Sequence, residues 1–204
     1  MSEVTPYRRV VDKASAEAIP LSAQFELTYR CNHLCTYCYN SPTGQREMTT
    51  PQLFEALRKI ADFGVVYVTL TGGEAMCHKD FFAIAHEVRR LGMVVRIYTN
   101  GYLLADPKTV ARVKELHPME VEVSIHGSRP ESHDALTRIK GSFVKTLKGL
   151  ENLRDAGLKI NLKCPITRLN QNELFEIRDI GLGLGVRVHF DAVITPKDDG
   201  DLDP

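Results

Sequence analysis

Short runs rich in β-branched residues alternate with longer amphipathic segments along the chain, and this alternation constrains the fold more than any other feature. Repeated βα units of this kind predict a parallel sheet covered by helices. The predicted strands are residues 24–28, 65–70, 94–98, 120–124, 159–164 and 187–190. The predicted helices are residues 50–63, 79–91, 107–116, 143–156 and 171–184. The pattern fits an open doubly wound sheet or a barrel, and both bind ligands at the carboxyl ends of their strands.

Length and composition narrow the class of protein. The chain has 204 residues, enough for a single domain with one sizeable core. Its 26 Lys and Arg residues are balanced by 26 Asp and Glu residues, so it lacks the broad positive field of nucleic-acid binders and anionic-membrane binders. No segment has the roughly 18 apolar residues of a membrane span, and the first residues do not resemble a signal peptide. We expect a cytoplasmic protein that acts on a protein, peptide or small molecule.

Polar and glycine-rich segments follow four of the predicted strands, at the point where each strand ends. A loop with three cysteines follows the first strand, and Thr71-Gly72-Gly73-Glu74 follows the second. Asn100-Gly101 follows the third strand, and residues 124–127 end the fourth. Because the carboxyl ends of parallel strands share one edge, we expect these four loops to converge on one face.

The cysteine loop carries the strongest chemical signal. Cys31, Cys35 and Cys38 have the spacing C-x3-C-x2-C, so one turn of chain can wrap three thiols around one centre. Thiolates are the ligands of both iron–sulfur clusters and structural zinc. A cluster with three protein thiolates leaves one iron open for a substrate or cofactor. The third interpretation is that these cysteines pack as small hydrophobic residues.

A closed zinc site would need a fourth ligand, and the chain offers His33, Cys77 and Cys164. We interpret His33 as a loop residue rather than a ligand. Cys77 and Cys164 have no spacing that suits an auxiliary cluster, so we interpret both as structural thiols. The odd total of five cysteines argues against a disulfide framework and favours reduced, metal-binding thiols.

The cysteine motif, with Tyr37 before its last cysteine, resembles the signature of the radical S-adenosylmethionine (radical SAM) superfamily. Residues 71–74 look like the GGE motif of that family, and residues 99–101, 124–127 and 133–143 also match. Together they resemble the subgroup whose members carry a C-terminal SPASM or twitch extension and modify peptides or proteins. The resemblance covers residues 25–204 and implies an α/β fold, a partial (β/α)6 TIM-like barrel of parallel strands. The final helix and the C-terminal extension are expected to be absent.

The resemblance implies that Cys31, Cys35 and Cys38 ligate a 4Fe-4S cluster. In the family, SAM chelates the fourth iron and is cleaved reductively to a 5′-deoxyadenosyl radical, which abstracts a hydrogen atom from the substrate. It also implies a SAM pocket at the strand ends. The implied cofactor-binding residues are Tyr37, Gly72, Gly73, Glu74, Asn100, Ser124, Arg138 and Phe190.

Several of these residues have specific expected roles. Glu74 is expected to accept a hydrogen bond from the SAM ammonium, and Arg138 to pair with the SAM carboxylate. Ser124 would contact the ribose, while Tyr37 and Phe190 would offer apolar surface for the adenosine. Each also has a purely structural interpretation: Ser124 as a cap of the next turn, for example, and Arg138 as a surface charge.

Four further positions complete the predicted site. Gly72 and Gly73 are expected to let the backbone approach a ligand closely, since glycine has no Cβ. Asn100 is expected to line the adenosine pocket or to shape the turn. His126 is a weaker candidate for substrate contact or proton transfer, and no other catalytic residue is assigned.

We divide the chain into an N-terminal lead-in (1–22), a core barrel (23–191) and a connector (192–204). Relatives of this subgroup continue well past the sixth strand, so we expect a fragment of a longer protein with an apolar edge prone to self-association. The predicted function is SAM cleavage, followed by hydrogen abstraction from a peptide or protein, with an external one-electron reductant such as flavodoxin or ferredoxin. The alternatives are a zinc-stabilised binding or scaffold domain and an iron–sulfur electron-transfer or sensor domain.

Overall fold

Six parallel strands form one sheet in the computed structural model, which describes residues 5–40 and 46–195. All six predicted strands are present, each within two residues of its predicted bounds. Each strand pairs with the next in chain order. No ladder joins the first strand to the last within the described residues, so the barrel is partial, as predicted. The strands are β1 (Ser22–Glu26), β2 (Tyr67–Thr71), β3 (Val94–Thr99), β4 (Glu120–Ser124), β5 (Ile160–Pro165) and β6 (Val188–Asp191).

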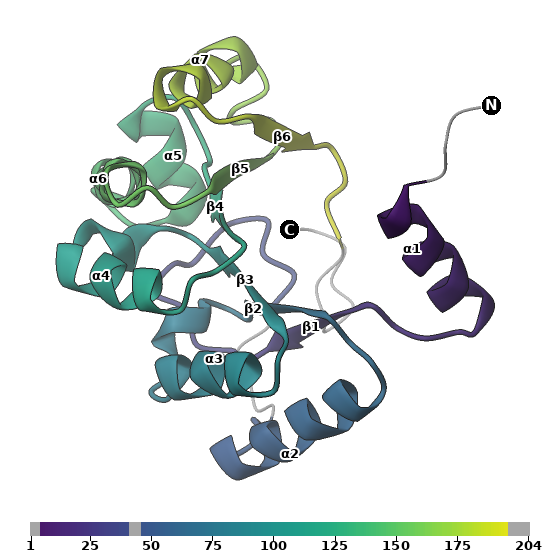
Figure 1. Cartoon of the computed structure of the whole chain (residues 1–204). Helices are drawn as coiled ribbons and strands as arrows, with labels where there is room; N and C mark the ends of the chain where they lie inside the picture. Colours follow the sequence, from purple (N-terminus) through teal and green to yellow (C-terminus); the bar gives the residue numbers. More distant parts are fainter. Residues whose placement is uncertain (1–4, 41–45, 196–204) are drawn as a thin grey trace.

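The five predicted helices are confirmed and cover one side of the curved sheet (Figure 1). They are α2 (Thr50–Asp62), α3 (Phe81–Arg90), α4 (Pro107–Glu115), α6 (Ser142–Asp155) and α7 (Leu174–Leu184). The structure adds elements that the sequence analysis does not predict. These are the helices α1 (Pro6–Ala16) and α5 (Pro130–Thr137) and the 3-10 turns η1 (Ala75–Cys77) and η2 (Tyr102–Ala105).

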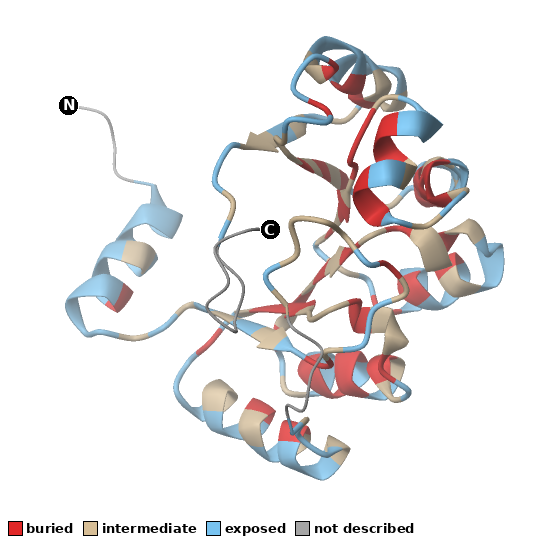
Figure 2. Cartoon of the chain, turned by 180° about the vertical axis from the view of Figure 1, so that it is seen from behind, coloured by how far each residue is buried: buried red, intermediate tan, exposed pale blue. Residues whose placement is uncertain are grey.

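Helix α1 lies within the predicted lead-in and stands away from the other helices (Figures 1 and 2). It begins at Pro6, and the Thr5 side chain accepts a hydrogen bond from the Arg8 amide. Ala14 is its one buried residue, so α1 adds little to the core. In the part of the chain that the structure describes, no helix is long and apolar enough to cross a bilayer.

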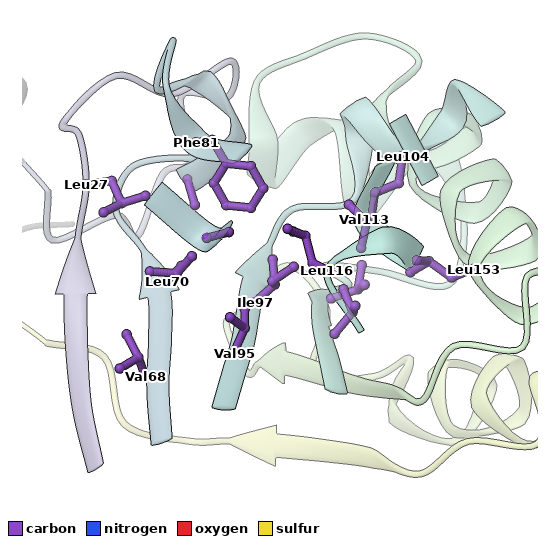
Figure 3. Close-up of a cluster of buried hydrophobic side chains, with 14 of the residues drawn as sticks. Leu27, Val68, Leu70, Phe81, Val95, Ile97, Leu104, Val113, Leu116 and Leu153 are labelled. Carbon is purple, nitrogen blue, oxygen red and sulfur yellow. The ribbon is translucent and has the colours of Figure 1, made fainter. Parts of the chain in front are cut away.

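The strands bury one face against the helices, because their side chains alternate between two faces. On β3, Val95 and Ile97 are fully buried, and on β4 the same holds for Val121 and Val123. Figure 3 shows β2 and β3 side chains together with Phe81 and with helix residues from α4 and α6. The intervening, more polar side chains therefore face the inside of the curved sheet, where a ligand can reach them.

Helix α6 packs against the segment that follows β3. Thr146 Oγ1 donates a hydrogen bond to the Asn100 carbonyl at 3.0 Å, and Asn152 Nδ2 donates to the Leu104 carbonyl at 3.0 Å. A Cβ on Gly149 would overlap the Gly101 carbonyl oxygen and lie 3.0 Å from Leu104 Cβ. Gly149 therefore sets how closely α6 approaches this segment, which leads directly from the predicted site.

We predict that Gly149→Ala lowers the free energy of unfolding by about 1–3 kcal/mol, because the added methyl group overpacks this contact. Gly183→Ala is the matched control on α7, where a Cβ meets no atom within 4 Å. There alanine should stabilise the helix by up to about 1 kcal/mol. Urea denaturation of both variants measures the difference, and equal effects would contradict this account of the packing.

Candidate functional site

A cavity of about 350 Å³ opens at the carboxyl ends of the strands. Residues from all six strands or the loops that follow them line it. The loops predicted to converge do so here. The predicted site residues in its wall are Cys31, Cys35, Tyr37, Cys38, Gly72, Gly73, Asn100, Ser124 and His126.

The start of the cysteine loop passes very close to the glycine pair after β2. The Gly73 amide donates to the Thr28 carbonyl at 2.7 Å, and the Glu74 amide donates to the Arg30 carbonyl at 2.9 Å. A Cβ on Gly73 would lie 2.6 Å from the Arg30 carbonyl oxygen, and one on Gly72 would lie 2.5 Å from that of Thr28. Gly72 also has φ +144°, which disfavours other residues. The close approach that these glycines permit is therefore to the cysteine loop itself.

Glu47 holds the same segment from another direction. Its Oε1 accepts hydrogen bonds from Thr28 Oγ1 at 2.5 Å and from the Tyr29 amide at 2.8 Å. The bond from Thr28 is the main reason that the pKa of Glu47 lies below its usual range. The sequence analysis misses this residue, because no motif or strand end marks its position.

The far side of the cysteine loop is attached to the end of α5. The Leu34 amide donates to the Thr137 carbonyl at 3.0 Å, and the Thr36 amide donates to the Leu136 carbonyl at 2.9 Å. The carbonyl groups in the last turn of α5 have no partner within the helix, so they accept hydrogen bonds from the loop. The cysteine loop is fixed between β2 on one side and α5 on the other.

Asp134 fixes the connection between α5 and α6. Its carboxylate accepts hydrogen bonds from the amides of Gly141 at 2.6 Å and Phe143 at 2.9 Å, and from Ser142 Oγ at 2.9 Å. Arg138 lies within this connection, with a left-handed backbone (φ 56°) and an exposed side chain. Arg138 is not among the residues that line the cavity, and its backbone makes the turn between α5 and α6.

The three predicted ligands differ in exposure but share the cavity wall. Cys31 is exposed, whereas Cys35 and Cys38 are half-buried. Burial, with the nearby thiol groups, raises the pKa of Cys35 to about 12. Although Cys31 is exposed over part of its surface, partial desolvation by the surrounding protein is the main reason that its pKa is raised to about 11. Without a bound metal, both groups are therefore neutral thiols at physiological pH.

Within residues 5–40 and 46–195, no three His, Cys, Asp or Glu side chains are gathered around one point as the ligands of a single ion would be. The fit to an iron–sulfur cluster rests instead on two observations. All three thiols face one cavity, and thiolate is the ligand that such clusters take. Ligand binding by these groups must release protons, since each thiol has to ionise.

Glu74 has a different environment from the one predicted. Its side chain is 1% exposed and is not part of the cavity wall. Thr99 Oγ1 lies 3.0 Å from both carboxylate oxygens, and the amides of Asn100 and Met76 donate to them at 2.8 and 3.2 Å. Burial raises the pKa of Glu74 despite these bonds. The carboxylate joins the loop after β2 to the loop after β3, and its contact with SAM remains a prediction.

Tyr37 and His126 form a hydrogen-bonded pair in the cavity wall. Tyr37 Oη lies 2.6 Å from His126 Nε2, and the His126 ring contacts that of His133 edge to face at 5.0 Å. Burial lowers the pKa of His126 well below its usual range, so the ring is neutral. His126 thus positions the aromatic ring of the cysteine loop. Its role in proton transfer remains a prediction.

Phe190 lies on the wrong face of β6 for the predicted contact. It packs with Val188 against the core and lines a separate surface hollow with Phe175 of α7. The next residue, Asp191, faces the cavity instead. The two-residue period of the strand therefore turns Phe190 away from the cavity wall.

The sequence analysis also misses the charged inner wall of the sheet. Glu122 and Lys163 line the cavity with Tyr98 and Asp191, and Lys163 Nζ lies 3.3 Å from Asp191 Oδ2. Burial is the main reason that the pKa of Glu122 is raised. A signal for this wall exists in the sequence, because each residue occupies the polar position of an alternating strand such as Glu120-Val-Glu-Val-Ser124.

The remaining candidate ligands have distinct positions. His33 lines the cavity and is 3% exposed, with no hydrogen-bond partner for either ring nitrogen among the described residues. Cys164 is fully buried, and Asn170 Nδ2 lies 3.6 Å from its sulfur. Cys77 is half-buried at the end of η1. The positions of Cys164 and Cys77 are consistent with structural thiols.

A family model described as the radical SAM superfamily matches residues 25–178, which hold the end of β1, the cysteine loop and strands β2 to β5. The chain belongs to the radical SAM superfamily.

Curated radical SAM relatives cover most of this chain. The chain is 30% identical over 189 residues to the mycofactocin maturase MftC of Mycolicibacterium smegmatis, covering 91% of this chain and 48% of the relative. It is 29% identical over 185 residues to an AdoMet-dependent heme synthase of Methanosarcina barkeri, covering 89% and 53%. The chain therefore spans about half the length of the curated relatives it matches.

Solved structures show the same radical SAM fold. Streptococcus suis SuiB bound to its precursor peptide SuiA superimposes with a TM-score of 0.74 at 19% identity, covering 93% of this chain and 45% of SuiB. SuiB bound to S-adenosylmethionine gives the same TM-score, with 92% of this chain covered. At this level of identity the similarity establishes the fold alone.

We predict that Gly73→Ala lowers both stability and iron uptake, although it changes no ligand. The methyl group would push Tyr29 and Arg30 away from the end of β2, at a cost of about 1–3 kcal/mol. Thermal unfolding and iron content per folded chain measure the two effects. Gly183→Ala again serves as control, and a Gly73→Ala protein with normal stability and full iron content would contradict the close contact described above.

Proposed function

We propose that this chain is the SAM-cleaving core of a radical SAM enzyme, in which Cys31, Cys35 and Cys38 hold a 4Fe-4S cluster. The observation that carries the proposal is the shared cavity, since three thiols of one loop face the ends of the other strands. Members of the superfamily use this cluster together with SAM. When bound, the two supply reductive cleavage of SAM to methionine and a 5′-deoxyadenosyl radical.

The chain's own contribution to cluster binding is to present three thiols on a fixed loop. Hydrogen bonds from β2 and α5 hold both ends of that loop. Because the pKa values of Cys31 and Cys35 are raised, cluster binding has to displace protons and should strengthen as pH rises.

The neighbouring wall offers groups suited to SAM. The Ser124 hydroxyl lines the cavity and makes no hydrogen bond with any described part of the chain, so it is available to a ribose hydroxyl. Tyr37 is held by His126 and offers an aromatic surface for adenine. Gly72 and Gly73 expose backbone beside them. Arg138 and Phe190 are omitted from this pocket because they lie outside its wall.

The substrate that we propose is a peptide or protein, and the support comes from the relatives. MftC is named as a maturase, and SuiB is bound to a precursor peptide. Another relative is named as a heme synthase, so the similar region also occurs in a protein that is not named as a peptide maturase. We further propose a one-electron reductant such as flavodoxin or ferredoxin. A cytoplasmic location suits the proposal, because its reducing conditions keep cysteines in the thiol form that a cluster requires.

We retain the division into a lead-in (1–22), a barrel (23–191) and a connector (192–204) as part of the proposal. Residues 1–4, 41–45 and 196–204 lie outside the described structure. Since the chain spans about half of its relatives, we propose that substrate recognition depends largely on segments corresponding to their other half.

Anaerobic reconstitution tests the proposal. We expect the wild-type chain to take up iron and sulfide and, after reduction, to convert SAM to 5′-deoxyadenosine. Single Ala substitutions of Cys31, Cys35 or Cys38 should each abolish both, whereas Cys164→Ala should keep the cluster at a cost of about 1 kcal/mol in stability. One zinc and no iron per chain would instead support the zinc-scaffold alternative. A stable cluster without SAM cleavage would support the electron-transfer or sensor alternative.

Ser124→Ala should weaken SAM binding by about 0.5–1.5 kcal/mol if the hydroxyl contacts the ribose. Isothermal titration calorimetry on the reconstituted protein measures this loss. Ser15→Ala, at an exposed position of α1, is the matched control and should bind SAM like the wild type. Equal affinities for all three proteins would remove Ser124 from the pocket.

A further inference from the structure

Asn100 lies in the loop after β3 and has hydrogen bonds at nearly all of its polar groups. Its amide donates to Glu74 Oε2 at 2.8 Å, and its carbonyl accepts from Thr146 Oγ1 at 3.0 Å. Its side-chain Oδ1 accepts from the Tyr102 amide at 3.0 Å. Only the side-chain NH2 group remains, so the direction in which it points is fixed by the rest of the residue.

That NH2 group lies between Asn32 and Cys31, the first cysteine of the loop. Asn100 Nδ2 lies 2.7 Å from Asn32 Oδ1 and 3.8 Å from Cys31 Sγ. Because Oδ1 is occupied by the Tyr102 amide, a flipped amide would place two donors together, and the network settles the orientation. Asn100 is therefore a preorganised donor within reach of both Asn32 Oδ1 and the sulfur of a predicted cluster ligand.

A second donor reaches the same sulfur from the loop. The His33 amide lies 3.3 Å from Cys31 Sγ. In the thiol form, Cys31 Sγ lies 4.0 Å from Asn32 Oδ1 and can donate its proton to it. An ionised, metal-bound sulfur has no proton to donate. As a thiolate, Cys31 would accept more strongly from Asn100, since charged acceptors form the stronger hydrogen bonds.

Hydrogen bonds to cluster sulfurs are one of the ways in which a protein sets reduction potential. Reduction adds negative charge to the cluster and its thiolates, so a donor at sulfur stabilises the reduced form more than the oxidised form. A donor at one of three ligands also makes that ligand unlike the other two.

We propose that Asn100 raises the reduction potential of the cluster by donating to Cys31 Sγ, and that Asn32 competes for the same NH2 group. This inference rests on the proposed function. It assigns Asn100 a role beyond lining the adenosine pocket or shaping the turn. It also gives Glu74 a positioning role, because Glu74 holds the Asn100 backbone.

The test is the midpoint potential of the reconstituted cluster without SAM, followed by electron paramagnetic resonance in a redox titration. Asn100→Ala removes the donor but keeps the backbone bonds to Glu74 and Thr146. We expect this variant to shift the reduction equilibrium about tenfold toward the oxidised cluster. For a one-electron step, that shift corresponds to a midpoint potential about 59 mV lower. Asn32→Ala, the matched control, should leave the potential unchanged or raise it, because the competing acceptor is gone.

The outcomes separate this inference from the proposed function. A wild-type chain that takes up no cluster overturns the proposed function and this inference with it. Cluster uptake with equal potentials in wild type and Asn100→Ala overturns this inference alone, as does an equal fall in Asn32→Ala. If Asn100→Ala fails to retain its cluster, Asn100→Asp is compared with Asn32→Asp. Both add a carboxylate near Cys31, but only the first removes the donor, so the first must lower the potential further.

Discussion

The contact between the glycine pair after β2 and the first residues of the cysteine loop is the constraint on which the site depends. Gly72 and Gly73 lie against the backbone of residues 28–30 at distances that no side chain tolerates. The bonds from this strand end and from α5 then leave the loop little freedom, and three thiols face the cavity as a result. A loop without such support would lose more conformational entropy on binding a cluster.

Glu74 extends this constraint from the second strand to the third. A buried carboxylate is costly unless hydrogen bonds satisfy it, and here the donors come from Met76, Thr99 and Asn100. The GGE motif thus acts as a unit in this structure: its glycines position the cysteine loop, and its glutamate positions the residue that reaches Cys31. Sequence, local backbone and cavity chemistry are linked through one short segment.

The sequence was sufficient for the sheet, the main helices and the convergence of loops, because hydrophobic periodicity and strand-end motifs are local signals. It was insufficient where geometry depends on partners distant in sequence. Helix α5, with eight residues, is too short for a clear period, so the sequence pattern does not show that Arg138 lies in the turn between α5 and α6. Residue chemistry alone does not give the alternation of side chains along a strand, which turns Phe190 toward the core and Asp191, Glu122 and Lys163 toward the cavity.

The central claim is that this cavity holds a cluster whose open iron binds SAM. The most direct measurement is the electron paramagnetic resonance spectrum of the reduced, reconstituted chain recorded with and without SAM. The account predicts a 4Fe-4S signal whose line shape changes when SAM is added, because a new ligand reaches the open iron. A spectrum that SAM leaves unchanged, in protein with full iron content, would contradict it.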